Sequence, residues 1–95
     1  MLDATVLIAI LKTRIKAARL RAGLTQENMA DALGHSVVYY QRFEGLNHRR
    51  TFNPTILTLF RLCDVLQIEL DELVHPPTED EINNLNAQEK PDRRG

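Results

Sequence analysis

Apolar side chains recur every three or four positions near the start of the chain. This spacing places them on one face of an α-helix, and it predicts a helix over residues 5–22. Gly23 follows, where a residue without a Cβ can take the left-handed conformation that ends a helix. The predicted buried stripe consists of Leu7, Leu11, Ile15, Ala18 and Ala22, with Lys12, Lys16, Arg19 and Arg21 largely off it.

A second and a third short helix are predicted on either side of Gly34, which permits a sharp reversal of the chain. Thr25 is the expected N-cap of the second helix, with Asn28 a poor partner for a capping box. Ser36 is the expected N-cap of the third helix. The pattern predicts that the inward-facing residues are Met29, Ala30, Leu33, Tyr40 and Phe43. The residues left on the other faces of the third helix are Val37, Val38, Tyr39, Gln41 and Arg42. Such an apolar exposed set is unusual for a helix that only faces solvent.

Residues 46–52 show no helical period and predict a loop in which Phe52 plugs the core. Asn53 and Pro54 suit the cap and first position of a fourth helix. A short fifth helix contains Leu70 and Leu73 and ends before two prolines. The fourth helix is expected to bury Ile56, Leu59, Phe60, Cys63 and Leu66, and Leu57, Leu62 and Val65 make it apolar almost all round, as in a central helix.

Thr78 and Glu81 fit a capping box in front of Ile82 and Leu85, so the sequence admits a further short helix. We therefore expect one helical domain over residues 1–77. An acidic C-terminal tail over residues 78–95 follows, with a short helix and then a disordered end.

Composition limits the function classes. The 95 residues leave room for one domain with a modest core. The lone Cys63 cannot form an internal disulfide or a cysteine-rich zinc site, which fits a reducing, cytoplasmic setting. The apolar run over residues 6–11 is too short to span a bilayer and lacks a preceding basic region, so neither a signal peptide nor a membrane anchor is expected.

The net charge is −1, but the charges are unevenly distributed. Basic residues dominate between residues 12 and 50, whereas acidic residues dominate from residue 69 onward. A polyanion would therefore meet the first half of the chain. An ordinary solvated helix surface explains the same asymmetry.

Nothing in the sequence indicates catalysis or metal binding. The three histidines and Cys63 are too far apart in sequence for a compact ligand motif. Ser36 and Cys63 lack an identifiable base, and there is no glycine-rich phosphate loop. We therefore expect no enzymatic activity, no metal and no cofactor.

The order and spacing of the motifs resemble the phage-repressor and Cro type of helix-turn-helix protein, which includes xenobiotic-response-element-like bacterial regulators. The likeness covers roughly residues 11–73. It implies an all-α, five-helix, lambda-repressor-like domain that binds DNA as a two-fold dimer and controls transcription. The residues that carry it are Arg14, Ile15, Arg19, Gly23, Leu24, Thr25, Gln26, Glu27, Met29, Ala30, Leu33, Gly34, Ser36, Arg42, Phe43, Glu44, Gly45, Pro54, Leu59, Leu66, Leu70, Asp71, Glu72 and Leu73.

The resemblance assigns the third helix, about residues 36–44, to the DNA major groove. Val37, Val38 and Arg42 would then reach base edges, where arginine bonds guanine O6 and N7 and valine packs on a thymine methyl. Gln26 resembles the glutamine with which the family contacts phosphate. The residues placed for backbone phosphates, which orient the domain without reading sequence, are Ser36, Tyr39 and Asn47.

Arg19 and Glu44 match a charged pair that in this family links the first helix to the end of the third. If the pair is buried, removal of one partner leaves an uncompensated charge.

The chain also departs from the family pattern. The loop from Leu46 to Asn53 is longer, and we expect its Arg49 and Arg50 to grip the phosphate backbone beside the groove. The alternative is a basic loop that makes no DNA contact. Gln67 stands where a glycine is usual and Glu69 where a serine-like cap is usual, which predicts a strained or reshaped turn.

Two functions fit these observations. The first is a sequence-specific transcriptional regulator that binds a palindromic operator in double-stranded DNA as a homodimer. The alternative is an antitoxin-like or adaptor protein that holds a protein partner through the acidic tail and the Ile82 and Leu85 face. The candidates for self-association are Ile68, Leu57, Leu73 and Val74, or the N-terminal Val6, Ile8 and Ile10.

Overall fold

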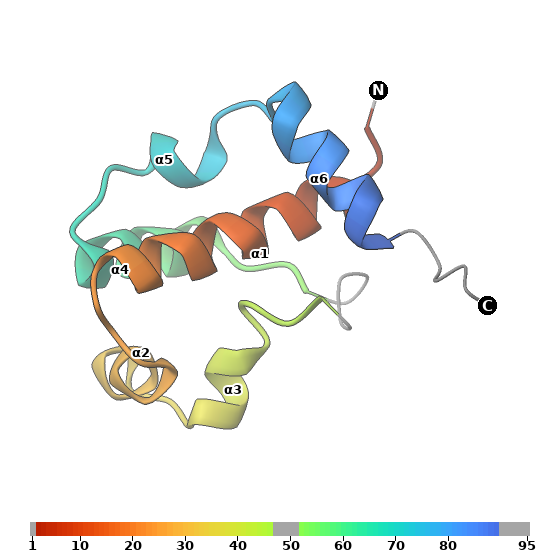
Figure 1. Cartoon of the computed structure of the whole chain (residues 1–95). Helices are drawn as coiled ribbons and strands as arrows, with labels where there is room; N and C mark the ends of the chain where they lie inside the picture. The colour runs from red at the N-terminus through yellow and green to blue at the C-terminus, as the bar shows by residue number, and fades with distance from the viewer. Residues whose placement is uncertain (1, 47–51, 90–95) are drawn as a thin grey trace.

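The structure, a computed structural model, describes residues 2–46 and 52–89. These residues form helices and no strand, which confirms the all-α prediction. In Figure 1, α2 and α3 lie on one side of α1, and α5 and α6 lie on the other. The helices are α1 (Ala4–Arg21), α2 (Gln26–Leu33), α3 (Val37–Gln41), α4 (Ile56–Leu66), α5 (Asp71–Val74) and α6 (Glu79–Glu89).

Local capping sets the boundaries of α2 and α3. Thr25 Oγ1 accepts a hydrogen bond from Asn28 N at 3.0 Å, and Asn28 Oδ1 accepts one from Thr25 N at 2.9 Å. Asn28 therefore completes a capping box, and the expectation that it would cap poorly was wrong, because an amide oxygen accepts this bond as a carboxylate would. Gly34 ends α2 with φ 75°, and Ser36 Oγ accepts from Tyr39 N at 3.1 Å to start α3.

The main hydrophobic core lies between α1, α2, α3 and α4. Tyr40 and Phe43 point into it as predicted, and Phe52, the last residue of the predicted loop, fills it as well. The rings of Phe43 and Phe52 meet edge to face, with centroids 5.1 Å apart. The predictions for these three aromatic residues, and for Met29 and Ala30, are confirmed.

The predicted stripe on α1 is only partly correct. Ile15 and Ala18 are buried, but Leu7 and Ala22 are exposed. The stripe fails at its ends because α1 is contacted on more than one face, by α5 and by α6, and because the helix has already ended before Ala22.

The N-terminus of α4 differs from its prediction. Its N-cap is Thr55 rather than Asn53, and the Thr55 hydroxyl oxygen accepts from Thr58 N at 3.1 Å. At the other end Gln67 takes the left-handed conformation, with φ 57° and ψ 48°. The sequence prediction of an unusual turn at this glycine-like position is therefore confirmed.

The helix α4 is not central. Leu59, Leu62, Cys63 and Leu66 face the core, but Ile56 and Phe60, which were expected to be buried, are 57% and 53% exposed. They are exposed because α4 packs against the core along one face only. Leu57 is exposed as well, so the start of α4 carries an apolar outer surface.

A sixth helix follows the predicted five. Thr78 Oγ1 accepts from Glu81 N at 3.1 Å, and Glu81 Oε1 accepts from Thr78 N at 3.0 Å. This capping box starts α6, and the predicted C-terminal helix is confirmed.

The helix α6 packs against α1 in a second, smaller cluster. Its buried members are Ala9, Ile10 and Leu85. Leu85 is therefore occupied within the chain, and the expectation that it presents a face to another protein was wrong. Ile10 and Leu73 are also buried, so they cannot join copies at a surface. The half-buried residues packed against this second cluster are Val6, Leu46 and Ile82.

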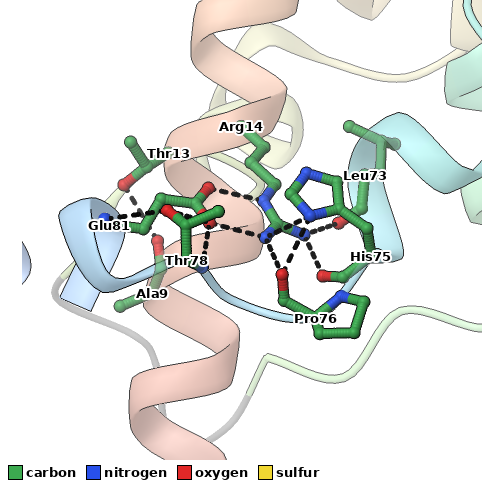
Figure 2. A network of polar contacts seen from close by, with 8 residues as sticks. All are labelled: Ala9, Thr13, Arg14, Leu73, His75, Pro76, Thr78 and Glu81. Carbon is green, nitrogen blue, oxygen red and sulfur yellow. Dashed lines mark hydrogen bonds and ion pairs between the residues drawn. The ribbon is translucent and has the colours of Figure 1, made fainter.

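A polar clamp joins α1 to the segment between α5 and α6 (Figure 2). The Arg14 guanidinium donates to both carboxylate oxygens of Glu81, each at 2.7 Å. It also donates to the carbonyl oxygens of Leu73 at 2.8 Å and His75 at 2.7 Å. Because an arginine fork can satisfy several acceptors at once, this one side chain fixes the path of the chain into α6.

Candidate nucleic-acid interface

The outward face of α3 presents few side chains. Val38 is 71% exposed, and Arg42 is exposed immediately after the helix. Val37 is half-buried against the main core, so it lies less far out than Val38. The helix itself covers Val37–Gln41, which is shorter than the predicted 36–44, because residues 42–44 form tight turns. One of these turns is closed by a bond from Phe43 N to Tyr40 O at 2.8 Å.

Ser36 and Tyr39 lie at the start of α3. The Ser36 hydroxyl serves as the N-cap acceptor. The Tyr39 ring stacks on His35 with centroids 4.0 Å apart and meets Phe43 edge on at 5.5 Å. These contacts hold a half-buried aromatic ring at the edge of the exposed face.

The first residue of α2, Gln26, is held from two sides. Its Nε2 donates to Glu44 Oε1 at 3.1 Å, and its Oε1 accepts from Gln41 Nε2 at 3.2 Å. Gln26 therefore connects the start of α2 to the end of α3 through side-chain hydrogen bonds. Gln41 was not among the predicted site residues, and no motif distinguished it from other exposed polar residues.

Below this surface lies a buried charged network. Arg19 and Glu44 are 8% and 9% exposed, and Arg19 Nε and Nη2 donate to the two Glu44 oxygens at 2.6 and 3.0 Å. The Tyr40 hydroxyl donates to Glu44 Oε2 at 2.5 Å. Arg19 Nη1 also donates to Leu24 O at 2.9 Å, so the guanidinium reaches the turn before α2. The network links α1, the turn between α1 and α2, and the end of α3.

The pKa values follow from this packing. Burial alone would raise the pKa of Glu44, but hydrogen bonds from Arg19, Tyr40 and Gln26 hold it below the usual value. Burial raises the pKa of Tyr40, and the hydrogen bond to Glu44 raises it further. The hydrogen bond to Glu44 also raises the pKa of Arg19. Glu44 is therefore a carboxylate and Tyr40 a neutral donor at neutral pH.

Lys12 also lies elsewhere than predicted. It was counted with the surface charges, yet its relative exposure is 0%. The signal was present in the spacing, because Lys12 lies three positions before Ile15 and seven before Arg19, and so shares their face of α1.

Three predicted contacts, Asn47, Arg49 and Arg50, lie outside the described residues. A hollow separates the end of α3 from the start of α4. The residues that line it include Tyr39, Arg42, Thr55 and Thr58. Arg42 therefore borders a recess rather than a flat surface.

Other chemistry is not indicated by the described part of the chain. Within residues 2–46 and 52–89, no group of three or more histidine, cysteine, aspartate or glutamate side chains could hold a metal ion. Burial raises the pKa of Cys63, the lone thiol. In the same ranges, none of the helices combines the length and apolar character needed to cross a bilayer.

Comparison with known proteins gave one match. A family model described as helix-turn-helix matches residues 15–73, which run from α1 through α5. Searches of curated proteins and of solved structures found no match.

Proposed function

The chain belongs to the helix-turn-helix family of the phage-repressor and Cro type, and we propose that it regulates transcription by reading a specific DNA sequence with α3 in the major groove. The observation that carries the proposal is the exposure of Val38 and Arg42 above the buried Arg19 and Glu44 pair. A firmly supported and outward-facing α3 is what base reading requires.

The side chains divide by role. Arg42 is the main polar reader, because a guanidinium bonds guanine O6 and N7 together. Val38, and Val37 less fully, supply apolar contact with thymine methyl groups. Gln26, Ser36 and Tyr39, with Asn47, Arg49 and Arg50, contact phosphates and orient the domain.

We also propose that the regulator acts as a homodimer on a palindromic operator. The support is the apolar surface at the start of α4, where Ile56, Leu57 and Phe60 are exposed together. Arg61 and Asp64 lie next to it on the same helix. A two-fold axis passing near these residues would bury the apolar surfaces of the two copies against each other, with Arg61 and Asp64 at the edge.

Selection of bound duplexes from a random pool tests the proposal. The parent should recover a palindromic motif with half-sites about 34 Å apart. Arg42→Ala should lose selectivity at defined positions, because only the guanine contact has been removed. Arg21→Ala is the matched control, since Arg21 is an exposed arginine of α1 whose guanidinium lies 3.9 Å from Glu72 of α5. Recovery of random sequence by the parent would contradict the proposal and favour the adaptor function.

A further inference from the structure

Lys12 is a buried lysine whose ammonium meets the end of α3. Its Nζ donates to Arg42 O and to Gly45 O, both at 2.6 Å. The same Nζ lies 4.2 Å from the centroid of the Phe52 ring. One side chain of α1 thus contacts the two ends of the stretch from Arg42 to Phe52.

These contacts have a specific electrostatic basis. The last carbonyl groups of a helix have no partner within the helix and carry its partial negative charge. A lysine ammonium satisfies such oxygens with charge-assisted hydrogen bonds, and the face of an aromatic ring attracts it as well. The Arg42 carbonyl lies at the C-cap of α3 and the Gly45 carbonyl lies just after the turns at residues 42–44, and Lys12 fixes the direction of both.

A second residue of α1 holds the same segment. Arg19, on the face shared with Lys12, binds the Glu44 carboxylate. Three positions from Arg42 to Gly45 are consequently tied to α1, two through backbone oxygens and one through a side chain. An apolar side chain could fill the space of Lys12 at a smaller desolvation cost, but it would not orient these carbonyls.

We propose that Lys12 is a positioning residue for DNA recognition, which sets the backbone direction from which Arg42 reaches the bases. The proposal rests on the proposed function above. It concerns a residue outside the matched family region, which begins at residue 15.

The test compares Lys12→Met with Lys16→Met, which removes the same charge from an exposed position of the same helix. The probe is the duplex that the parent selects from a random pool, with a duplex altered at the base pair read by Arg42 as its partner. Lys12→Met should bind the selected duplex on the order of tenfold more weakly and lose most of its preference over the altered duplex. Lys16→Met should keep that preference.

A second comparison separates positioning from a loss of stability. In an Arg42→Ala background, Lys12→Met should change affinity little, because the side chain that it positions is already absent. If Lys12→Met does not fold, Lys12→Gln, which keeps a shorter donor, takes its place in both comparisons, with the same expected losses.

Two results overturn the inference while leaving the proposed function intact. One is an unchanged affinity and preference in the Lys12 variant. The other is an equal loss of affinity with and without Arg42, which would indicate a general structural role. If the parent itself binds no duplex selectively, the proposed function fails and this inference fails with it.

Discussion

Replacement of Arg19 by alanine provides a direct test of the buried network. The change leaves the Glu44 carboxylate, which is 9% exposed, without its bidentate partner. Breaking a buried ion pair in this way costs about 3–5 kcal/mol. Tyr40 and Gln26 still donate to the carboxylate, so we expect the lower end, about 3 kcal/mol. In a domain of this size such a loss lowers the Tm by more than about 10 °C.

The loss should depend on pH. In the parent, the pKa of Glu44 lies below its unfolded value, so its contribution is present above about pH 4.3 and is lost as the pH falls further. Without Arg19, burial becomes the dominant influence and raises the pKa of Glu44 above the unfolded value. Protonation then stabilises the variant at acidic pH. The difference in unfolding free energy should therefore narrow by roughly 1–2 kcal/mol between pH 7 and pH 4.

Urea denaturation of the parent and Arg19→Ala at both pH values measures this difference. Arg21→Ala is the control, because Arg21 and Glu72 are 3.9 Å apart with side chains 62% and 46% exposed. It should change stability by less than about 0.5 kcal/mol. The selected DNA motif should be the same for Arg19→Ala as for the parent. A melting temperature equal to the parent's, or a loss independent of pH, would refute the reasoning.

Three further predictions concern other elements. The hydrogen bond from Arg14 lowers the pKa of Glu81 to about 2. Glu81→Gln should therefore lower the free energy of unfolding by about 1–2 kcal/mol at pH 7, after allowance for partial exposure. The difference from the parent should disappear as a denaturation series approaches pH 2. Gly34→Ala should lower the free energy of unfolding by roughly 1 kcal/mol in the same assay, because φ is +75°, which disfavours any residue with a Cβ. The cost should come from this backbone conformation alone, since the added Cβ would meet nothing within 4 Å. An unchanged denaturation midpoint would show that the turn tolerates a side chain. Truncation after Pro77 should uncover Ile10 and lower the Tm, yet keep most DNA affinity, whereas complete loss of DNA binding would show that α6 takes part in recognition.

The elements that could be predicted from sequence are those with local causes. Thr25, Gly34 and Ser36 mark helix ends through their own backbone and side-chain chemistry, and all three lie where the pattern placed them. The inward positions of Tyr40 and Phe43 follow from the three-residue spacing in the same way.

The errors have tertiary causes. Ile56 and Phe60 are apolar residues on a helical face that the remainder of the chain leaves uncovered, and no local pattern reveals which face that is. Leu85 is buried because α6 folds back on α1, a contact between distant parts of the sequence. In the candidate site, the residue types near α3 were predictable, but the link from Glu44 through Gln26 to Gln41 depends on side-chain positions.

The two apolar clusters give the chain an uneven resistance to local opening. The smaller cluster has three buried members, Ala9, Ile10 and Leu85, and lies apart from the larger one. Segments with few buried contacts exchange their amide hydrogens through sub-global opening before the whole domain unfolds. The amides of α6 should therefore exchange with solvent earlier than those of α2 and α4. Because Leu46 packs in the same cluster, each such opening also releases the chain just after Gly45.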